Sequence, residues 1–416
     1  MGPLVDEAVR PDLVDPPAAP RRCSTGRVEC ARLEWRLGDP GDPARRVEEF
    51  LADLGLPVGD LAAPPARPAG HGPGSLCGAA LFVSAAAGAR MAGAPAGPAT
   101  PLPALPDVVA VAYHHRPEGG APPEPWIPPR TRPGIFRLGR WRDSWTPNEH
   151  ADAVRQVRAA IGRGDVYQVN LVGHAAAAYT GDPRPALARL GVLPGARYGG
   201  VLTGTGWAIG CASPETLVEV RDGRVGTRPI KGTRPATPRG RQELLASAKE
   251  RAEHVMIVDL ERNDLARIAK VGSVRVDELY AVRRWCDLWQ AESAVSATVA
   301  DGVGLAGLLR AVCPGGSVTG APKTAALAQI AGLEPVGRGA SMGALGWIGP
   351  DGIDLGLTIR TAAADAHRVH LWAGGGITWG SDPEAEVAEA AAKARPIRAA
   401  LAGAAAPVRN PIPCHP

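Results

Sequence analysis

Apolar positions recur along this chain with two spacings, and each spacing predicts a different kind of element. In residues 44–55 apolar side chains return every three or four positions, as in a short amphipathic helix. Residues 78–85 and 107–115 are continuous apolar runs, as in buried strands. The proline- and glycine-rich residues 95–106 and 117–133 interrupt this pattern and are predicted to form loops.

From about residue 140 strands and helices alternate. Thr146 supplies an N-cap hydroxyl, Pro147 stands at the first helical position and Glu149 completes a capping box, which predicts a helix through residue 164. The same periodicities predict helices at 241–257, 305–312, 322–333 and 383–401, and strands at 166–174, 207–213, 216–230, 341–349, 354–364 and 368–379. The pattern predicts that neighbouring strands form hairpins and that helices lie between these groups of strands. The predicted fold class is therefore α+β with antiparallel sheets.

Composition divides the chain into four predicted segments. Residues 1–25 are Pro-rich without periodicity and are expected to form a flexible arm, and residues 403–416 are expected to form a frayed tail. Residues 26–140 are expected to form an N-terminal α+β region that completes the core of a main domain at residues 141–402.

The composition excludes several partners and locations. With 416 residues and 45% hydrophobic side chains, the chain can bury a large core. Its 46 basic and 42 acidic residues leave a net charge of +4 without any block of like charge, so nucleic acid and membrane surfaces are not expected partners. Seven scattered cysteines without a CxxC pair, and no long apolar segment, predict a cytoplasmic protein with reduced thiols.

Three glycine-rich stretches are candidates for ligand contact. Residues 302–307 match GxGxxG but lack the acidic residue that a ribose needs further on, so a tight turn is predicted. Residues 314–324 lack the adjacent glycine and lysine of a P-loop, and they form either an anion-binding loop before a helix or a tight turn. The triple glycine in 373–377 either bulges a strand or brings its backbone close to a ligand.

Two predicted helices carry carboxylates three residues apart. Glu250 and Glu253 share one face of the first, and Glu386 and Glu389 share one face of the second, with Lys393 one turn further on. Such pairs are either solvated helix faces or ligands for a hard cation such as Mg²⁺, which takes one or two carboxylates together with substrate oxygens and water.

The stretch TRPIKGTRP at residues 227–235 holds three cations, Arg228, Lys231 and Arg234, with no carboxylate among them. Lys231 is a surface charge, part of an anion clamp, or a nucleophile whose pKa the flanking guanidinium groups lower. Together with the glycine loops and the carboxylates, this stretch indicates a metal-assisted pocket for a small dianion.

Eight motifs, in this order, resemble those of the chorismate-utilising enzymes, which include anthranilate, aminodeoxychorismate, isochorismate and salicylate synthases. The matching stretches are GDVYQVNL (164–171), ASPETL (212–217), RPIKGTRP (228–235), KERAEHVMIVDLERNDLARI (249–268), PGGSVTGAPK (314–323), GALGW (343–347), LTIRT (357–361) and GGGITWGSDPEAEVAEAAAKA (374–394). The resemblance implies two packed antiparallel sheets surrounded by helices, with residues 141–402 as the chorismate-binding catalytic domain. Residues 1–140 show almost none of this resemblance to the family.

The resemblance also implies a magnesium site. It assigns Glu253 and Glu389 to Mg²⁺, which holds the ring carboxylate of chorismate, and places Glu250 and Glu386 close by.

The remaining substrate contacts come from other motifs. By resemblance, Arg360 and the backbone of Gly374, Gly375 and Gly376 take the enolpyruvyl carboxylate. Glu215 is implied to be the general acid that protonates the departing 4-hydroxyl. Thr233, Lys393 and Gln168 are expected to line the same pocket.

Two positions point to the aminodeoxychorismate synthase branch, component I. Isochorismate and salicylate synthases carry a water-activating lysine where this chain has Gln168, and an amide has no basic lone pair. Anthranilate synthases typically have alanine at the position of Lys231. The implied mechanism is a covalent lysine intermediate, with ammonia from a glutamine amidotransferase partner, on the route to p-aminobenzoate.

Other branches remain alternatives: anthranilate synthase, isochorismate or salicylate synthase, and a catalytically silent chorismate-binding paralogue. The chain departs from the family at Gln290, where histidine is common, at Ser341, where an aromatic residue is common, and at residues 193–200, where many members read NPxPY. A tryptophan-binding signature is not recognisable in the N-terminal region.

Overall fold

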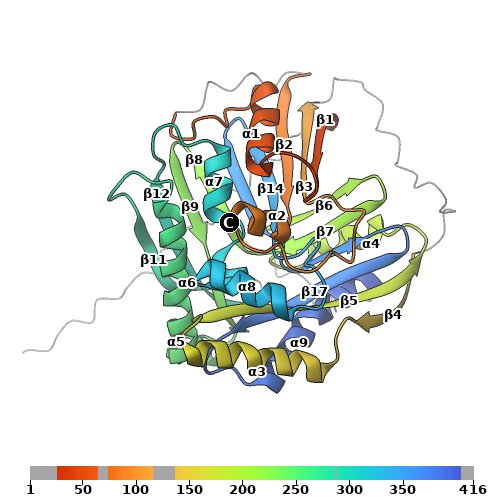
Figure 1. The fold of residues 1–416 in the computed structure, drawn as a ribbon, viewed down its shortest axis with the longest axis vertical. Coiled ribbons are helices and arrows are strands. Elements are labelled where there is room, and N and C mark those ends of the chain that lie inside the picture. The colour runs from red at the N-terminus through yellow and green to blue at the C-terminus, as the bar shows by residue number, and fades with distance from the viewer. Residues whose placement is uncertain (1–25, 64–73, 116–135, 286–287, 404–416) are drawn as a thin grey trace, which may run out of the picture.

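The computed structural model describes residues 26–63, 74–115, 136–285 and 288–403, and in these ranges all paired strands are antiparallel. The strands build two sheets with helices around them (Figure 1). The predicted arm at 1–25, the predicted loop at 117–133 and all but the first residue of the predicted tail lie outside the described residues.

The larger sheet has ten strands within the described residues, in the order β1-β3-β2-β14-β15-β8-β9-β12-β10, with β11 paired to β12. Its strands are β1 (Arg27–Trp35), β2 (Leu76–Val83), β3 (Val108–His115), β8 (Thr216–Arg221), β9 (Arg224–Arg228), β10 (Ile230–Pro235), β11 (Arg275–Trp285), β12 (Leu288–Thr298), β14 (Ala344–Gly349) and β15 (Gly352–Leu357). The N-terminal strands β1 to β3 therefore belong to the same sheet as the strands of the candidate site, through the pairing of β2 with β14.

The smaller sheet has seven strands within the same described ranges, in the order β13-β5-β17-β16-β7-β6, with β4 paired to β5. Its strands are β4 (Arg137–Asp143), β5 (Gln168–Thr180), β6 (Tyr198–Gly204), β7 (Trp207–Ser213), β13 (Gly320–Ala321), β16 (Thr361–Ala364) and β17 (Arg368–Ile377).

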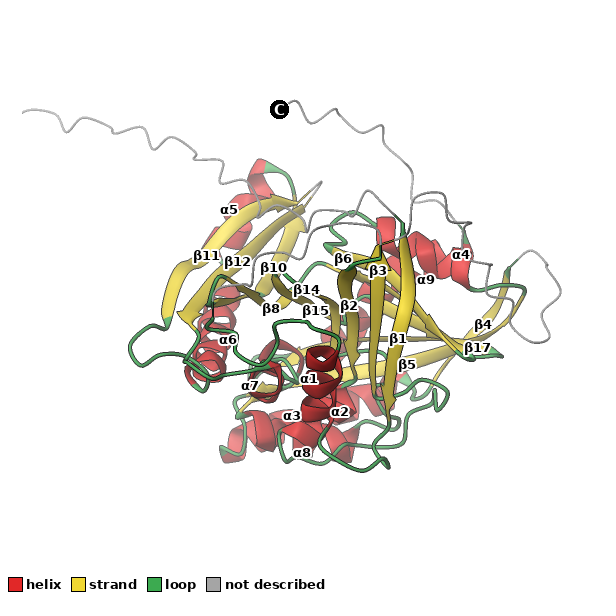
Figure 2. Cartoon of the chain, turned by 90° about the horizontal axis from the view of Figure 1, so that it is seen from above, coloured by secondary structure: helices red, strands yellow, loops and turns green. Residues whose placement is uncertain are grey.

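Helices cover the outer faces of both sheets. The α-helices are α1 (Pro43–Asp53), α2 (Ala85–Met91), α3 (Pro147–Arg163), α4 (Arg184–Ala188), α5 (Pro238–Ala246), α6 (Ala248–Ala266), α7 (Leu305–Val312), α8 (Lys323–Leu333) and α9 (Pro383–Ala402), and short 3₁₀ turns are η1 (Arg189–Val192) and η2 (Gly316–Val318). Helices α3 and α9 lie side by side along the smaller sheet, and α5 and α6 flank the β11–β12 end of the larger one (Figures 1 and 2). None of the described helices is long and apolar enough to cross a membrane.

The largest apolar core lies between the two sheets. It joins Phe82 and Leu355 from the larger sheet with Ile209 and Trp372 from the smaller one, all of them buried. Burying apolar surface stabilises a fold by about 25 cal/mol per Å², so this shared core fixes the packing of one sheet on the other. Side chains that point out of the core at the edges of this packing are free to form a site.

The predicted fold class is confirmed: the chain is α+β with two antiparallel sheets. The helix predicted after Thr146 is α3, which begins with the expected capping box and ends at Gly164 in the left-handed conformation. The strand with three glycines is also present as β17, and its pairing with β5 continues through Gly374 to Gly376 without a register shift. A bulge at this position was therefore the wrong alternative.

Several predicted boundaries are wrong. The helix expected at 241–257 is two helices, because Ser247 ends α5 and caps α6 by accepting a hydrogen bond from Glu250 N at 3.3 Å. The strand expected at 216–230 is the hairpin β8–β9, which turns at Asp222 and Gly223, both with positive φ. Strands β11 and β12 were not predicted at all, since their charged and apolar residues alternate only in part.

The capping box gives a direct test of the local sequence reasoning. Thr146→Ala is expected to lower the free energy of unfolding by about 1 kcal/mol, because Glu149 N loses the hydroxyl that accepts its hydrogen bond at 3.2 Å. The measurement is the urea midpoint of the purified protein. Thr146→Ser keeps the acceptor and serves as the matched control. Equal midpoints for the alanine and serine variants would contradict the prediction.

Candidate active site

Residues predicted for the site converge between the two sheets. Two of these residues come from the larger sheet or its edge: Glu215 lies in the turn between β7 and β8, and Lys231 lies on β10. Glu389 lies on α9, in the layer of the smaller sheet. Lys231 interacts electrostatically with both carboxyls and also with Glu253 on α6. The structure thus brings together groups that are separated by more than a hundred residues in the sequence.

Glu215 has the environment of a proton donor. Its carboxyl is buried, and Ser317 Oγ donates a hydrogen bond to Oε1 at 2.8 Å. Burial raises the pKa of Glu215, while the charges of Lys231 and Arg360 and the hydrogen bond from Ser317 lower it only in part. A carboxyl held in this way keeps its proton to a higher pH than a solvated one.

The cations that flank Lys231 do not act as the sequence suggested. Arg228 lies 3.7 Å from a carboxylate oxygen of Glu219 and 3.4 Å from one of Glu292, and Arg234 lies 3.5 Å from Glu250 Oε1. Both guanidinium groups therefore have their own acidic partners. The expectation that they act on Lys231 as uncompensated charges is wrong, because carboxylates remote in sequence neutralise them.

Lys231 instead faces acidic groups of the site. It lies next to Gly232, where the ladder between β10 and β12 shifts register and φ is +72°. A Cβ on Gly232 would come within 3.1 Å of Glu250 Oε2, so the glycine lets the strand approach α6. The side chain of Thr233 lies outside the described part of the structure, and its role stays a prediction.

Carboxylates from α6 and α9 destabilise one another's ionised forms. Burial raises the pKa of Glu253, and the charges of Glu250 and Glu386 raise it further. The charges of Lys249 and Lys231 lower this pKa, but the net shift is upward. Burial also raises the pKa of Glu386, and Glu389 adds to that effect.

Glu389 behaves differently from these two carboxyls. Burial acts to raise its pKa, but Lys393 together with Lys249 and Lys231 lowers it, and the net shift is downward. The amine of Lys393 lies 2.7 Å from Glu389 Oε1 and also donates to the carbonyl oxygen of Gly374 at 3.0 Å. Lys393 thus links α9 to the glycine segment of β17.

No group of three or more His, Cys, Asp or Glu side chains in the described ranges is arranged as a finished metal cluster. The donor chemistry nevertheless fits Mg²⁺, which needs only one or two carboxylates and completes its shell with water and substrate oxygens. Glu386 is buried, Glu253 is half-buried and both have raised pKa values, and a divalent cation beside them would favour their ionised forms.

The triple glycine of β17 permits close approach on both sides of the strand. A Cβ on Gly374 would lie 1.8 Å from the carbonyl oxygen of Leu171, and one on Gly375 would lie 3.2 Å from Glu386 Oε2. A Cβ on Gly376 would lie 2.5 Å from Nε2 of Gln168. No larger residue fits at Gly374 or Gly376 without moving the neighbouring groups.

Gln168 and Arg360 present polar groups to the same region. The amide of Gln168 is 1% exposed, and neither its oxygen nor its nitrogen has a hydrogen-bond partner in the described structure. Buried polar atoms without partners are rare in folded proteins and indicate a place for a ligand or water. Arg360 has a φ of +50°, and burial lowers the pKa of its guanidinium while Glu215 opposes that shift.

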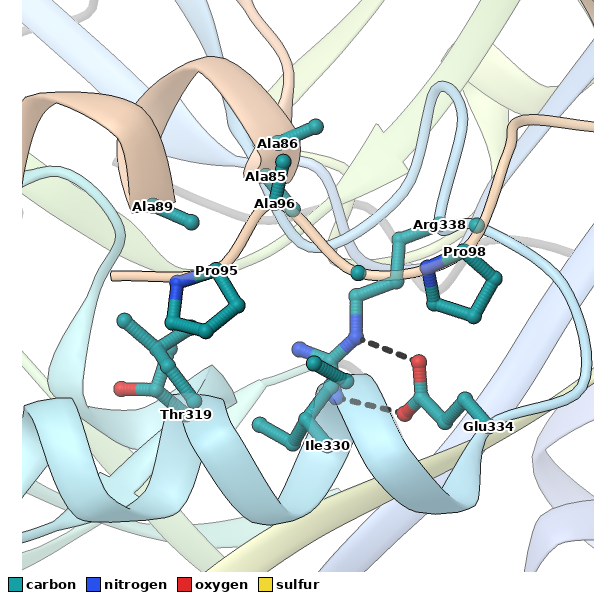
Figure 3. Close-up of a pocket in the computed structure, with 14 residues that line it drawn as sticks. Ala85, Ala86, Ala89, Pro95, Ala96, Pro98, Thr319, Ile330, Glu334 and Arg338 are labelled. Carbon is teal, nitrogen blue, oxygen red and sulfur yellow. Dashed lines mark hydrogen bonds and ion pairs between the residues drawn. The ribbon is translucent and has the colours of Figure 1, made fainter. Parts of the chain in front are cut away.

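Sequence reasoning missed Ser317 and the buried pair that positions it. Ser317 lies in η2, within the loop that was predicted to bind an anion or to turn. Next to it, the carbonyl oxygen of Val318 accepts from Arg338 at 2.7 Å, and that of Asn170 also accepts from Arg338 at 2.7 Å. Arg338 contacts Glu334 at 2.7 Å as well (Figure 3). The cavity beside this pair has a volume of about 20 Å³ and none of the predicted site residues lines it, so it holds no substrate.

Sequence reasoning also missed His254 and Glu261 on α6. His254 is fully buried, its two ring nitrogens have no partner in the described structure, and burial followed by the charge of Lys231 lowers its pKa to about 4. Burial raises the pKa of Glu261 to about 8, with Glu215 adding to the shift, while Thr227 donates a hydrogen bond to its carboxyl. Neither residue stood out in the sequence, because burial cannot be read from a single helical position.

Two of the three departures from the family pattern, Gln290 and Ser341, are buried. Gln290 on β12 lies opposite Thr233 and Arg283 in the ladder of the larger sheet. Ser341 is fully buried and donates a hydrogen bond to the carbonyl oxygen of Thr358 at 3.2 Å. At residue 341 a small polar side chain thus fills the space just before β14.

The fold has two antiparallel sheets with a lysine and acidic side chains gathered between them. Comparison with known proteins identifies the class of protein that has this fold and site. Residues 121–399 match the family of chorismate binding enzymes, and the chain belongs to that family. The crystal structure of anthranilate synthase component I from Streptococcus pneumoniae has the same fold, with a TM-score of 0.72 and 23% identity over 94% of this chain and 95% of that one.

Relatives with assigned activities fall in two groups. Aminodeoxychorismate synthase component 1 of Salmonella typhimurium is 41% identical over 262 residues, which are 61% of this chain and 58% of that relative. Anthranilate synthase component 1 of Streptomyces coelicolor is 39% identical over 270 residues, which are 63% of this chain and 53% of that relative. The chain thus spans between half and two thirds of the length of these curated relatives.

Glu261 makes the stability of the protein depend on pH in a defined direction. The carboxyl keeps its proton in the folded state up to about pH 8, whereas in the unfolded chain it loses the proton near its usual value of about 4.3. Between these values the folded state binds more protons, so the free energy of unfolding falls as pH rises, by at most about 1.4 kcal/mol per pH unit from this group.

The measurement is the urea midpoint between about pH 5 and pH 8 for the parent and for Glu261→Gln, which has no proton to lose. We expect the variant to gain stability relative to the parent as pH rises. Glu243→Gln, at a carboxylate on the surface of α5, is the matched control. Parallel pH curves for the parent and Glu261→Gln would contradict the prediction.

Proposed function

We propose that this chain aminates chorismate, as component I of an aminodeoxychorismate synthase. The observation that supports this most is the position of Lys231, which interacts electrostatically with the carboxyls of Glu215, Glu253 and Glu389 in a member of a family that binds chorismate. The first relatives that the sequence matches carry the name aminodeoxychorismate synthase component 1.

Chorismate has a ring carboxylate and an enolpyruvyl carboxylate, and the pocket offers a partner for each. Arg360 provides a buried guanidinium, which binds carboxylates with strong charge-assisted hydrogen bonds. The backbone of Gly374–Gly376 allows the enolpyruvyl group to approach without a steric clash, and Gln168 has free amide groups beside it. Together these groups orient the ring between Lys231 and Glu215.

Glu253 and Glu389 would hold Mg²⁺ against the ring carboxylate, with Glu386 and Glu250 beside them. The bound ion would supply positive charge that neutralises this carboxylate. Glu250 also pairs with Arg234, which makes it a weaker candidate ligand than Glu253. The protein residues then have to supply the nucleophile and the acid.

The amination proceeds in two displacements. The nitrogen of Lys231 forms a bond to ring carbon 2, the ring double bonds shift, and the C4–O bond breaks as Glu215 gives its proton to the departing hydroxyl, which leaves as water. Ammonia then forms a bond to carbon 4, the double bonds shift back, and the bond between carbon 2 and the Lys231 nitrogen breaks to release the free amine. The ammonium group formed at carbon 4 gives one proton back to Glu215, which restores the starting state of the protein. The product is 4-amino-4-deoxychorismate, with the enolpyruvyl group retained, a precursor of p-aminobenzoate.

The ammonia comes from a separate glutamine amidotransferase subunit or from ammonium salts. The name component 1 of the relatives is consistent with a second component, and the motifs of this chain include no glutaminase nucleophile. Anthranilate synthase component I is the alternative function, because relatives with that name match over the same part of the chain. In that reaction the enolpyruvyl group leaves as pyruvate.

Product identity separates the two functions. The purified chain, given chorismate, ammonium and Mg²⁺ at mildly alkaline pH, is expected to form 4-amino-4-deoxychorismate, identified by chromatography with mass detection. Chelation of the metal should stop the reaction, and excess Mg²⁺ should restore it. Anthranilate together with pyruvate would establish the alternative, and isochorismate would overturn the interpretation of Gln168.

The covalent step has its own test. Intact mass spectrometry after incubation with chorismate and without ammonia is expected to show an adduct on the parent that Lys231→Ala lacks. The variant should also lose at least about a hundredfold in ammonia-dependent rate, the usual scale for removing a catalytic group. Lys270→Ala, at a lysine paired with Asp301 on the surface, is the matched control. A variant at position 231 with the full rate rules out a nucleophilic role.

A further inference from the structure

A second cleft lies on the other side of α9 from the candidate active site. It has a volume of about 150 Å³ and opens between the start of α3, strands β4, β5 and β17, and helix α9. In Figure 1 these helices run side by side beneath the smaller sheet. None of the residues predicted for the active site lines the cleft. It is therefore a separate cavity with its own chemistry.

One wall of the cleft is aromatic. The rings of Trp145 and His150 stack with their centroids 4.5 Å apart and their planes 18° apart. Burial lowers the pKa of His150, so its ring is neutral at physiological pH. The indole packs tightly against β5, because a Cβ on Gly173 would lie 2.9 Å from its Nε1. This wall is a flat and rigid surface on which another ring can stack.

The opposite wall is apolar, and the far end holds the ion pair of Arg398 and Asp143. Leu371 and Ala373 of β17 and the side chains of Val387, Ala390, Ala391 and Ala394 on α9 line the apolar side. At the end, one nitrogen of the Arg398 guanidinium contacts Asp143 Oδ1 at 3.0 Å, whereas Nε is buried without any hydrogen-bond partner in the described structure. A buried N–H without an acceptor costs free energy, and a ligand that accepts from it recovers that cost.

We propose that this cleft binds a small aromatic carboxylate. The ring packs against the stacked pair of Trp145 and His150, and a carboxylate oxygen accepts the hydrogen bond from Nε of Arg398, on the edge of the guanidinium that Asp143 leaves open. The size agrees with a single ring, since an apolar cavity of about 150 Å³ holds benzene in another protein. Two walls of the cleft select an aromatic ring, and the unpartnered Nε of Arg398 selects the acid as a hydrogen-bond acceptor.

A ligand in this cleft contacts the helix that carries the candidate metal ligands. The cleft side chains of α9 at 387, 391, 394 and 398 follow one helical stripe, and Glu386 and Lys393 each come one residue before a member of that stripe, whereas Glu389 lies on the opposite side of the helix. On β17 the relation is similar, because Ala373 lines the cleft and Gly374 accepts from Lys393. A ring that separates α9 from β17 therefore also displaces Glu389 and Lys393 from the glycine segment.

Titration calorimetry with benzoate as the probe tests the binding site without any assay of activity. We expect saturable binding of benzoate, with benzamide and cyclohexanecarboxylate at least about tenfold weaker, since each lacks one selected feature. Ala391→Leu fills the cleft from an exposed position on α9 and should abolish binding, whereas the matched exposed variant Ala392→Leu should bind as the parent does.

Arg398→Met distinguishes recognition of the acid from recognition of the ring. This variant should weaken benzoate to the level of benzamide and leave the affinity for benzamide unchanged, which also demonstrates that the cleft is intact. The proposal is overturned if benzoate shows no saturable binding, if benzoate and benzamide bind equally to the parent, or if Ala391→Leu binds benzoate like the parent.

The effect on the active site rests on the proposed function and is measured separately. Saturating benzoate is expected to raise the KM for chorismate in the parent and in Ala392→Leu but not in Ala391→Leu. An unchanged KM in the parent would overturn the link through α9. If the chain does not turn over chorismate, the calorimetric result still shows whether the cleft binds benzoate. A failure of the proposed function can therefore be distinguished from a failure of the proposed binding site.

Discussion

The buried ion pair between Glu334 and Arg338 is the interaction on which the site depends most. Removing two charges from water is costly unless every donor and acceptor finds a partner, and here the partners are the backbone of β5 and the loop of η2. Arg338 holds the carbonyl oxygens of Asn170 and Val318, while Glu334 accepts from Val172 N at 3.0 Å. The pair therefore fixes the loop that places Ser317 on Glu215.

The chemistry of the site follows from bringing two sheets together. Lys231 comes from the larger sheet, and Glu389 and the glycines of β17 come from the layer of the smaller one. Lys231 interacts electrostatically with Glu215 and Glu253 on the side of the larger sheet and with Glu389 on the side of the smaller one. The sequence separation of these groups explains why the apolar core between the sheets matters for function: it holds opposing charges in place where water no longer screens them fully.

Local features of the fold could be predicted from the sequence, and those that depend on long-range pairing could not. The capping box at Thr146 and the close approach at Gly374–Gly376 follow from residue types that are side by side in the chain. The ordered motifs correctly indicated the family. The partners of Arg228 were out of reach, because Glu219 and Glu292 become its neighbours only through the register of β8, β9 and β12. Burial of Glu261 is equally invisible without the packed sheet.

The pairing of β2 with β14 has a consequence for how the protein is made. Val83 lies opposite Ala344, so one edge of the apolar strand β2 has no partner until more than two hundred and fifty further residues have left the ribosome. At roughly 5–20 residues per second, that edge remains open for tens of seconds. Unpaired apolar strand edges invite association with other chains. The yield of folded protein in a cell is therefore set by what shields β2 while the rest of the chain is being translated.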